Sequence, residues 1–242
     1  MPTDTIVRTP QLRLRQTGAA WPFAVAHAGP IARHWARRSA ENPAFYDGEV
    51  LVLRELASGA DGTDGVLSLE RFSAFLYWRD QGRPDDATLD GFGSAIVRSA
   101  EGHVMVGRTA TNTLNPGRVY LPGGFLDARD ARPDGSIDID ASIARELREE
   151  TGLDAGRLQR LPGYLVARHG RHCCFAIEWH SELPAAALVD RMHRGLAEDP
   201  DRELVEILVV REPADLERYD VLSHARFVIA HVLGGQPPGP VA

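Results

Sequence analysis

One stretch constrains the chain more than any other. It is RELREETGL at residues 145–153, which follows the glycine pair of LPGG at 121–124. Each residue of an α-helix advances about 100° around the axis, so Glu146, Glu149 and Glu150 share one face within an arc of about 100°. Three carboxylates this close repel one another unless a cation lies among them. The stretch is therefore either a solvated acidic surface or an oxygen-rich cation site.

The residues around the glutamates favour the cation site. A helix is expected over residues 140–151, with Asp140 as its N-cap and Gly152 as a left-handed C-cap. Hard divalent cations such as Mg²⁺ prefer oxygen ligands, several waters and substrate phosphates. The thiolates and imidazoles that typically bind zinc are missing from the stretch. A divalent cation together with a phosphate-bearing substrate suits this cluster.

The stretch resembles the second half of the Nudix box, whose pattern is Gly-x5-Glu-x7-Arg-Glu-U-x-Glu-Glu-x-Gly-U, with U apolar. Seven positions match in register from Arg145 to Leu153, and the LPGG turn is similar to the turn that opens the box. The resemblance is close over residues 121–153 and extends in strand order over about 89–215. It implies a hydrolase of the Nudix (MutT-related) family, which uses Mg²⁺ or Mn²⁺ to hydrolyse nucleoside diphosphates linked to another moiety.

The resemblance also implies roles for individual residues. Glu146, Glu149 and Glu150 are expected to hold the metal and carry the catalysis, with one of them as a candidate base. The carbonyl of Gly123 is expected as a further metal ligand. Arg145 is expected to pair with a glutamate and hold its rotamer. The metal would polarise the phosphoryl oxygens and lower the pKa of the attacking water.

The pattern is interrupted between the glycines and the helix. Twelve residues, where the pattern has five, separate Gly124 from the position of the first box glutamate, and that position holds Ile137. Asp138 and Asp127 are the candidates to replace the missing glutamate. The insertion at 125–137 is either a tolerated surface loop, since loop length costs little, or a flap that shapes the substrate pocket. The missing glutamate also keeps open a catalytically disabled Nudix domain that senses nucleotides.

Residues outside the box complete the predicted site. Arg108 and Arg118 flank TATNTLNPG near the mouth of the box, and the planar guanidinium suits diphosphate recognition. Together with Gly124 they are the predicted substrate-binding residues. Glu203 and Glu206 precede a strand where many family members carry an additional carboxylate, and Glu206 is the preferred candidate for this catalytic role.

Composition excludes several other functions. The net charge of −7 over 242 residues argues against nucleic-acid or membrane partners, and no apolar run approaches the roughly 18 residues of a membrane span. All 27 basic residues are arginine, which excludes a Schiff-base or phosphate-loop lysine. Cys173 and Cys174 are adjacent, too close for an ordinary disulfide, and indicate strand residues in a reducing cytoplasm. His169 and His172 flank a hairpin turn and are expected to be exposed.

The pattern of elements predicts an α+β chain of two parts. Residues 1–88 form an N-terminal α/β extension, and residues 89–242 form the Nudix fold, a mixed sheet sandwiched between helices. In the extension we expect a helix at 21–40 kinked at Pro30, strands at 49–56 and 65–72, and a helix at 72–80. In the second part we expect strands at 91–99, 102–110, 117–124, 164–169, 173–180 and 204–210, further helices at 184–196 and 222–233, and a frayed tail at 234–242.

The extension suggests a substrate class. NPAFYDGEVLVL at 42–53 and LSLERFSAFLYWRD at 67–80 resemble the N-terminal part of the UDP-glucose pyrophosphatase branch of the family. A nucleotide sugar such as UDP-glucose is therefore the leading substrate, with ADP-ribose next. The alternatives are a nucleoside triphosphate pyrophosphohydrolase with the same metal site and the disabled nucleotide-sensing domain. An exposed strand of the extension could also support a homodimer.

Overall fold

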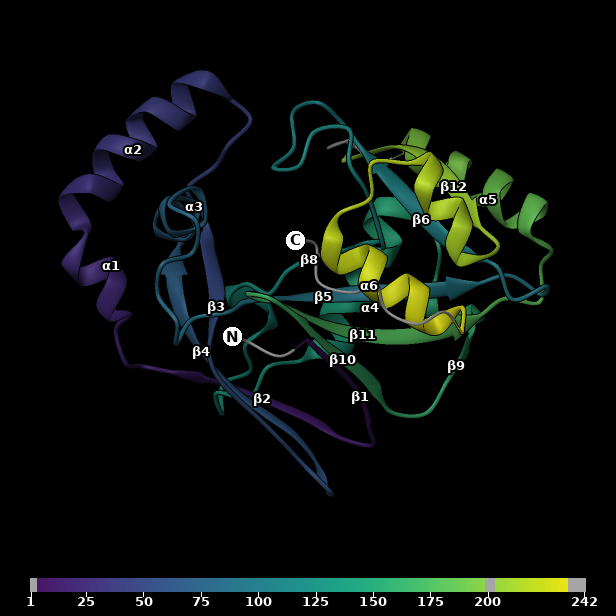
Figure 1. Ribbon diagram of the computed structural model, residues 1–242, viewed down its shortest axis with the longest axis horizontal. Helices are drawn as coiled ribbons and strands as arrows, with labels where there is room; N and C mark the ends of the chain where they lie inside the picture. The colour runs from purple at the N-terminus through teal and green to yellow at the C-terminus, as the bar shows by residue number, and fades with distance from the viewer. Residues whose placement is uncertain (1–3, 199–202, 235–242) are drawn as a thin grey trace.

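The computed structural model describes residues 4–198 and 203–234, which form two β-sheets with helices packed against them (Figure 1). The strands are β1 (Thr5–Thr9), β2 (Leu12–Thr17), β3 (Glu49–Gly59), β4 (Gly62–Arg71), β5 (Asp90–Arg98), β6 (Val104–Thr109), β7 (Val119–Tyr120), β8 (Gly123–Phe125), β9 (Gln159–Arg160), β10 (Tyr164–His169), β11 (His172–His180) and β12 (Leu204–Val210). The α-helices are α1 (Pro22–Ala26), α2 (Ala28–Glu41), α3 (Phe72–Asp80), α4 (Ile139–Thr151), α5 (Ala185–Glu198) and α6 (Ser223–Val232).

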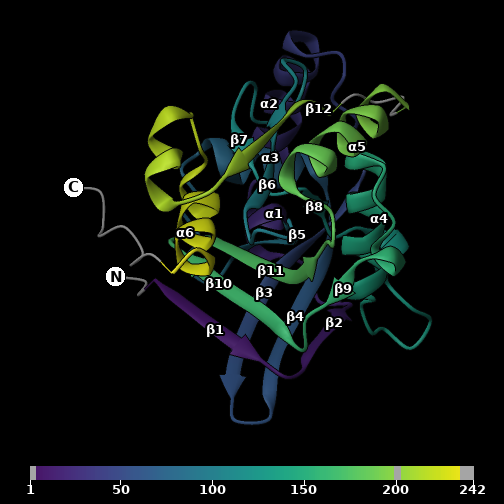
Figure 2. The same ribbon diagram turned by 90° about the vertical axis from the view of Figure 1, so that its right-hand side faces the viewer.

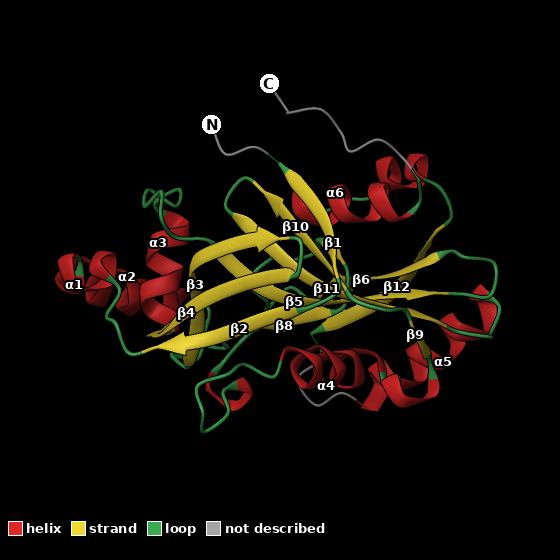
Figure 3. Ribbon diagram, turned by 90° about the horizontal axis from the view of Figure 1, so that it is seen from below, coloured by secondary structure: helices red, strands yellow, loops and turns green. Residues whose placement is uncertain are grey.

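The larger sheet has the strand order β1-β10-β11-β5-β6-β12. The pair β11–β5 is parallel and the other pairs along this path are antiparallel, so the sheet is mixed. Helices α4 and α5 cover one face and α6 covers the other (Figures 2 and 3). Separate apolar clusters fill the two interfaces, one around Ile143 and Leu188 and the other around Phe227 and Ile229. The predicted sheet between helices is confirmed.

The extension has its own sheet, β2-β4-β3, and its own core. Trp21, Phe75 and Trp78 are almost fully buried there, with α3 between the sheet and α2. The predicted helix at 21–40, expected to be kinked or split at Pro30, is split into α1 and α2, but the break falls at His27, three residues before the proline. Pro30 lies in the first turn of α2, where its missing N–H has no helical acceptor to lose.

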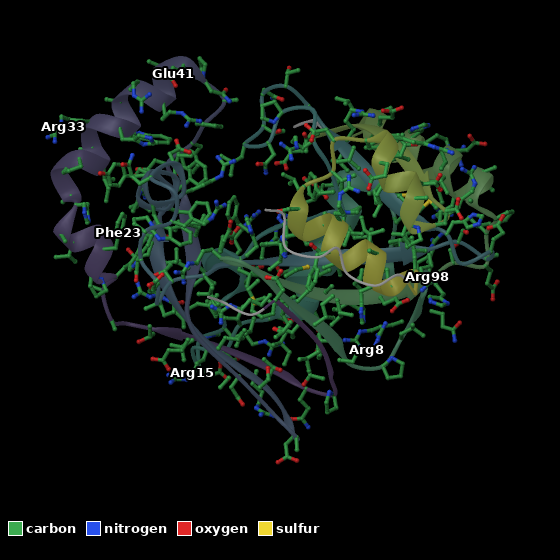
Figure 4. The ribbon with its side chains drawn as sticks, in the orientation of Figure 1. Arg8, Arg15, Phe23, Arg33, Glu41 and Arg98 are labelled. Carbon is green, nitrogen blue, oxygen red and sulfur yellow. The ribbon has the colours of Figure 1, made fainter. Side chains whose placement is uncertain are left out.

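The first two strands were not expected from the sequence. β2 runs parallel to β4 in the extension, but β1 pairs antiparallel with β10 and so joins the larger sheet. Arg8 on β1 donates to the buried Glu178 at 2.5 Å, and Arg98 on β5 donates to the same carboxylate at 3.2 Å (Figure 4). The N-terminal segment therefore contributes to both sheets, and the boundary at residue 88 stays a prediction.

Most of the other predicted elements are present. Helix α3 and strand β12 have the predicted bounds, whereas β3 and β4 are longer than expected and leave only residues 60–61 between them. The predicted tail lies, beyond Gly234, outside the described residues. No helix in the described part of the chain is long and apolar enough to cross a membrane.

Candidate active site

Helix α4 carries the glutamates, and its inner face decides where they lie. Ile143 and Leu147 are fully buried against the larger sheet, which turns the neighbouring face toward the strand ends. Gly152 ends the helix at φ 67°, the predicted left-handed cap. The predicted N-cap is wrong by two residues: Asp138 accepts from the backbone N–H of Ala141 at 3.1 Å, so the helix begins one residue earlier than expected.

The glycine pair lets the backbone approach this helix closely. A Cβ on Gly123, which has φ 153°, would lie 2.1 Å from the carbonyl oxygen of Gly93. A Cβ on Gly124 would lie 2.5 Å from Oε2 of Glu146. The first contact is with the backbone and the residue has a positive φ, so Gly123 is required. At Gly124 a side chain would displace the carboxylate of Glu146 from its place beside the turn.

Glu150 fastens the glycine turn to α4. It is 2% exposed, and its Oε2 accepts from the backbone N–H of Gly123 at 2.7 Å. Its Oε1 accepts from the hydroxyl of Tyr120 at 2.8 Å. Burial raises the pKa of Glu150 well above its usual range, and the neighbouring Glu146 adds to the effect. Both oxygens are engaged, so Glu150 holds strand, turn and helix together.

Arg145 holds Glu146 in place, as the sequence predicted. Its Nη1 donates to Oε1 of Glu146 at 2.5 Å and lies 3.6 Å from Oε2 of Glu149, whose side chain is about half exposed. Burial raises the pKa of Glu146 to about 7, with Glu149 and Glu203 adding to the rise and Arg145 opposing it. Glu146 is therefore a buried carboxylate in a field of other carboxylates.

Asp130 replaces the missing box glutamate. It lies six residues after Gly124, the spacing of the pattern, and its buried carboxylate accepts from Nη2 of Arg145 at 2.8 Å. Of the two candidates from the sequence, Asp138 caps α4 and Asp127 pairs with Arg129 at 2.6 Å, so the geometry favours Asp130 over both. The extra seven residues therefore follow the acid, not precede it.

Those extra residues, 131–137, form a small loop closed at its base. Ala131 pairs with Ile137, and the N–H of Asp138 donates to the carbonyl of Asp130 at 2.7 Å. The loop is tied to β2, since the N–H of Gln16 donates to the carbonyl of Gly135 at 2.7 Å. No residue of 131–137 lines the two cavities described next, so the geometry favours a tether to the extension for this part of the insertion. The first part of the predicted insertion does shape the pocket, because Phe125, Asp127 and Arg129 line the second cavity.

Two cavities flank the glycine turn, with volumes of about 350 Å³ and 490 Å³. We call them the basic cavity and the extension cavity. The basic cavity contains Arg79, Arg83 and Arg118 in its wall, and the extension cavity contains Phe45, Tyr46 and Glu146. Five residues line both, namely Thr113, Leu114, Gly124, Phe125 and Glu203. The cavities therefore meet at the glycine turn.

Of the two glutamates and two arginines considered outside the box, one of each lines a cavity and one of each does not. Glu203 lines both cavities and raises the pKa of Glu146, whereas Glu206 lines neither and accepts from Arg108 at 2.7 Å. Arg118 lines the basic cavity, and Arg108 does not. The geometry thus supports Glu203 and Arg118, and it gives no support to Glu206 and Arg108, which form an ion pair between β6 and β12.

Sequence reasoning missed four residues of the basic cavity and misjudged one of them. His172 is not an exposed turn residue: it lines the cavity, and burial lowers its pKa. Its ring lies 4.6 Å from that of His224, which comes from α6. Arg79 and Arg83 come from α3 and the turn after it. No local pattern marks any of the four, because they meet only in the folded chain.

The donor chemistry fits a hard divalent cation. Glu146, Glu149 and Glu203 offer carboxylate oxygens, whereas both oxygens of Glu150 already accept hydrogen bonds. Within residues 4–198 and 203–234, no three His, Cys, Asp or Glu side chains converge as a ready metal site. Mg²⁺ is usually held by one or two carboxylates, with waters and substrate phosphates completing its shell. The residues therefore fit an ion that binds together with its substrate.

Comparison with known proteins decides the family. The model of the NUDIX domain matches residues 90–226, more than half of the chain. The chain belongs to the Nudix family. A computed match to solved structures gives, among others, the MutT protein from Methanosarcina mazei Go1 at 19% identity over 60% of this chain and 92% of that one, with a TM-score of 0.36.

Two further Nudix structures have similar values. A Nudix hydrolase from Alicyclobacillus acidocaldarius is 16% identical over 60% of this chain and 91% of that one, with a TM-score of 0.42. The Nudix hydrolase RenU from M. smegmatis is 15% identical over 58% and 80%, with a TM-score of 0.36. At these values the structures carry no argument about function. No curated protein matches the chain significantly.

The Nudix assignment confirms the predicted hydrolase family and α+β fold. Nudix hydrolases act on small nucleotide substrates and generally use divalent metal ions. The UDP-glucose pyrophosphatase branch, the identity of the metal and the individual site residues stay predictions.

Proposed function

We propose that this Nudix protein is a divalent-metal-dependent hydrolase that cleaves the diphosphate of a nucleoside diphosphate linked to another moiety, of the nucleotide-sugar or ADP-ribose type. The observation that carries the proposal is the pair of cavities meeting at Gly124, Phe125 and Glu203. A substrate with a group on each side of its diphosphate can place the phosphates at this junction and one group in each cavity.

The residues at the junction have distinct roles in this proposal. Glu146, held by Arg145, and Glu203 would bind the ion, with Glu149 and the Gly123 carbonyl as further ligands. When bound, the ion polarises the phosphoryl oxygens and lowers the pKa of the attacking water. Glu203 lines both cavities and is the carboxylate placed to take the proton of that water.

Three other residues would position the glycine turn or the substrate. Glu150 is engaged with Tyr120 and Gly123, so we assign it to holding the glycine turn. Arg118 lies on the basic-cavity side and would bind a phosphate oxygen through its planar fork. Gly124 keeps the floor of the junction free of a side chain.

The alternatives fit less well. The disabled-domain hypothesis rested on Ile137, and Asp130 now supplies the carboxylate that was thought to be missing. A nucleoside triphosphate has an organic group on one side of its phosphates only, and would leave one cavity without an organic group. The aromatic residues of the extension that line the second cavity support a substrate with two ends.

The test is a phosphate-release screen with Mg²⁺ and with Mn²⁺ over UDP-glucose, ADP-ribose, NADH, dinucleoside polyphosphates and nucleoside triphosphates, with a coupling phosphatase. We expect rapid cleavage of a two-ended substrate that is lost in Glu146→Gln. Faster cleavage of the triphosphates would favour the one-ended alternative. Absence of turnover across the panel, with nucleotide binding retained, would contradict the proposal.

Two further predictions accompany it. A homodimer through the extension sheet, β2-β4-β3, is tested by light scattering of the full chain. A cytoplasmic location is consistent with Cys173 and Cys174, which are buried and free. A fluorescent fusion in the source cell tests it.

A further inference from the structure

The wall of the basic cavity has two arginines that the chemistry at the glycine turn does not use. Arg79 is largely buried, and its Nη2 donates to Oδ1 of Asn115 at 2.9 Å. Arg83 is also largely buried, and its Nη2 lies 3.1 Å from Oδ2 of Asp90 and 3.0 Å from Nε2 of His172. Both arginines come from the extension, outside the segment matched by the family model.

Arg83 is held in an unfavourable backbone conformation. Its φ of 58° makes it the one residue other than glycine with positive φ in the part of the chain that the structure describes. It also precedes Pro84, and the left-handed region costs a residue with a Cβ about 1 kcal/mol or more. The guanidinium lies 5.7 Å from the centroid of the Trp78 ring. Such strain persists where the surrounding structure holds a side chain in place, and clusters at ligand sites.

Arg83 also has hydrogen-bonding capacity left over. Its Nε is buried and has no hydrogen-bond partner among the described residues. A guanidinium has five N–H donors and no acceptor, and the contacts of Arg83 with Asp90 and His172 both use Nη2. The donors on Nη1 are therefore left for a ligand in the cavity that Arg83 lines.

The wall of the basic cavity has more arginines than carboxylates. Arg79, Arg83 and Arg118 line it, against Asp90 and Glu203. Outside the wall, Asp80 lies 3.6 Å from Arg79 and Asp220 lies 3.1 Å from Arg118. His172 and His224 add no charge near neutral pH, because burial lowers the pKa of each, and Arg83 lowers both further. Partly desolvated arginines in excess over carboxylates favour an anionic group.

We propose that Arg79 and Arg83 in the wall of the basic cavity form a specificity subsite that binds an anionic group, a carboxylate or a phosphate, on the moiety linked to the nucleoside diphosphate. The proposal rests on the proposed function and deepens it. The diphosphate itself lies at the glycine turn in that proposal, so this group is an additional negative charge. The extension thereby selects acidic substrates over neutral analogues.

Matched substrate pairs test this directly. UDP-glucuronate and UDP-glucose differ in one carboxylate, and NADPH and NADH differ in one phosphate, so each pair isolates one source of charge. We expect the wild-type chain to have the higher kcat/KM for the anionic member of at least one pair. In Arg79→Gln and Arg83→Gln the ratio within that pair should fall by about tenfold or more, since a charged hydrogen bond contributes about 1.5–3 kcal/mol.

The ratio is measured within one protein sample, so partial misfolding of a variant does not alter it. Arg33→Gln is the matched control, because Arg33 is an exposed arginine of the same extension that extends away from the cavity (Figure 4). Its ratio should equal that of the wild type. A wild-type chain that cleaves both members of both pairs equally would overturn the subsite. So would variants that lose activity toward both members in the same proportion, because the arginines would then act on the diphosphate or the fold.

Failure of the proposed function gives a different result. If none of the four compounds is cleaved, calorimetry without added metal still measures their binding. Tighter binding of an anionic member, lost in Arg83→Gln, would uphold the subsite on a protein that lacks the proposed activity. Equal affinities within both pairs would overturn it.

Discussion

The two ends of the site differ in charge, in origin and in how far the sequence describes them. At the acidic end, Glu146, Glu149 and Glu150 come from five consecutive residues of one helix. At the basic end, Arg79, Arg83, His172 and His224 come from α3, the turn after it, β11 and α6. The acidic end belongs to the part of the chain that the family shares, and the arginines belong to the extension. This suggests that one end supplies the chemistry and the other selects the substrate.

The largest effect should come from the acidic end. In Glu146→Gln the carboxylate beside the glycine turn is lost while its size is kept, so the ion loses a ligand and kcat should fall about a thousandfold. The thermal midpoint should not fall, because a neutral side chain relieves repulsion from Glu149 and Glu203. Steady-state kinetics and a melting curve measure both. Retained activity would remove Glu146 from the metal site.

The second-largest effect is on stability, and it tests whether Asp130 takes the place of the first box glutamate. Asp130 is buried and accepts from Arg145, Ser142 and the N–H of Asp127. Asp130→Ala leaves the guanidinium of Arg145 without this partner and should lower the free energy of unfolding by about 3 kcal/mol. Urea denaturation measures it. The exposed Asp134, in the neighbouring loop, is the control: Asp134→Ala should change stability by about 0.5 kcal/mol or less. Equal effects would show that Asp130 has no special role.

Asp130 also shows where sequence reasoning stopped. The box pattern predicted α4, its glycine cap and the pairing of Arg145 with Glu146, because these depend on residues a few positions apart. When the box spacing is counted back from Arg145, the position of the first box glutamate falls on Ile137. When it is counted forward from Gly124, the same position falls on Asp130. A loop can be inserted on either side of the acid, and only the fold decides which count holds.

The basic end could not be predicted in the same way. His172 follows a turn, where side chains are usually exposed, and its side chain is only 21% exposed because α6 brings the His224 ring to within 4.6 Å of its own. Arg83 is followed by proline in a polar linker, and nothing local indicates its positive φ. The choice between Glu206 and Glu203 depends on the fold for a related reason, since the two lie before or early in one strand and only the strand pairing separates them.

The third prediction separates these two glutamates. Glu203→Gln removes the carboxylate placed to accept the proton of the attacking water, and general-base removal typically costs about a hundredfold or more in kcat. Glu206→Gln breaks only a half-exposed ion pair with Arg108 and should change kcat less than about threefold. The kcat of both variants is measured with the best substrate of the screen. The reverse order would restore Glu206 as the catalytic carboxylate.

The smallest effect concerns pH and the basic end. Burial lowers the pKa of His224 well below its usual value, with His172, Arg83, His169 and Arg118 adding to the shift. Below about pH 6.5 the His224 imidazole is therefore protonated in the unfolded chain but not in the folded chain. The stability of the folded chain due to neutral His224 is present above that pH and is lost as the pH falls. One proton contributes at most about 1.4 kcal/mol per pH unit. In His224→Phe, which keeps a ring beside Phe92, the drop in the free energy of unfolding between pH 7.5 and 5.5 should be smaller than in the wild type.

The acidic end has the opposite pH dependence. The raised pKa of Glu146, about 7, means that its contribution to stability is present at low pH and lost as the pH rises. Glu146→Gln should therefore leave the acid loss intact or deepen it. Identical pH slopes in His224→Phe and the wild type would show that the basic end does not control acid stability.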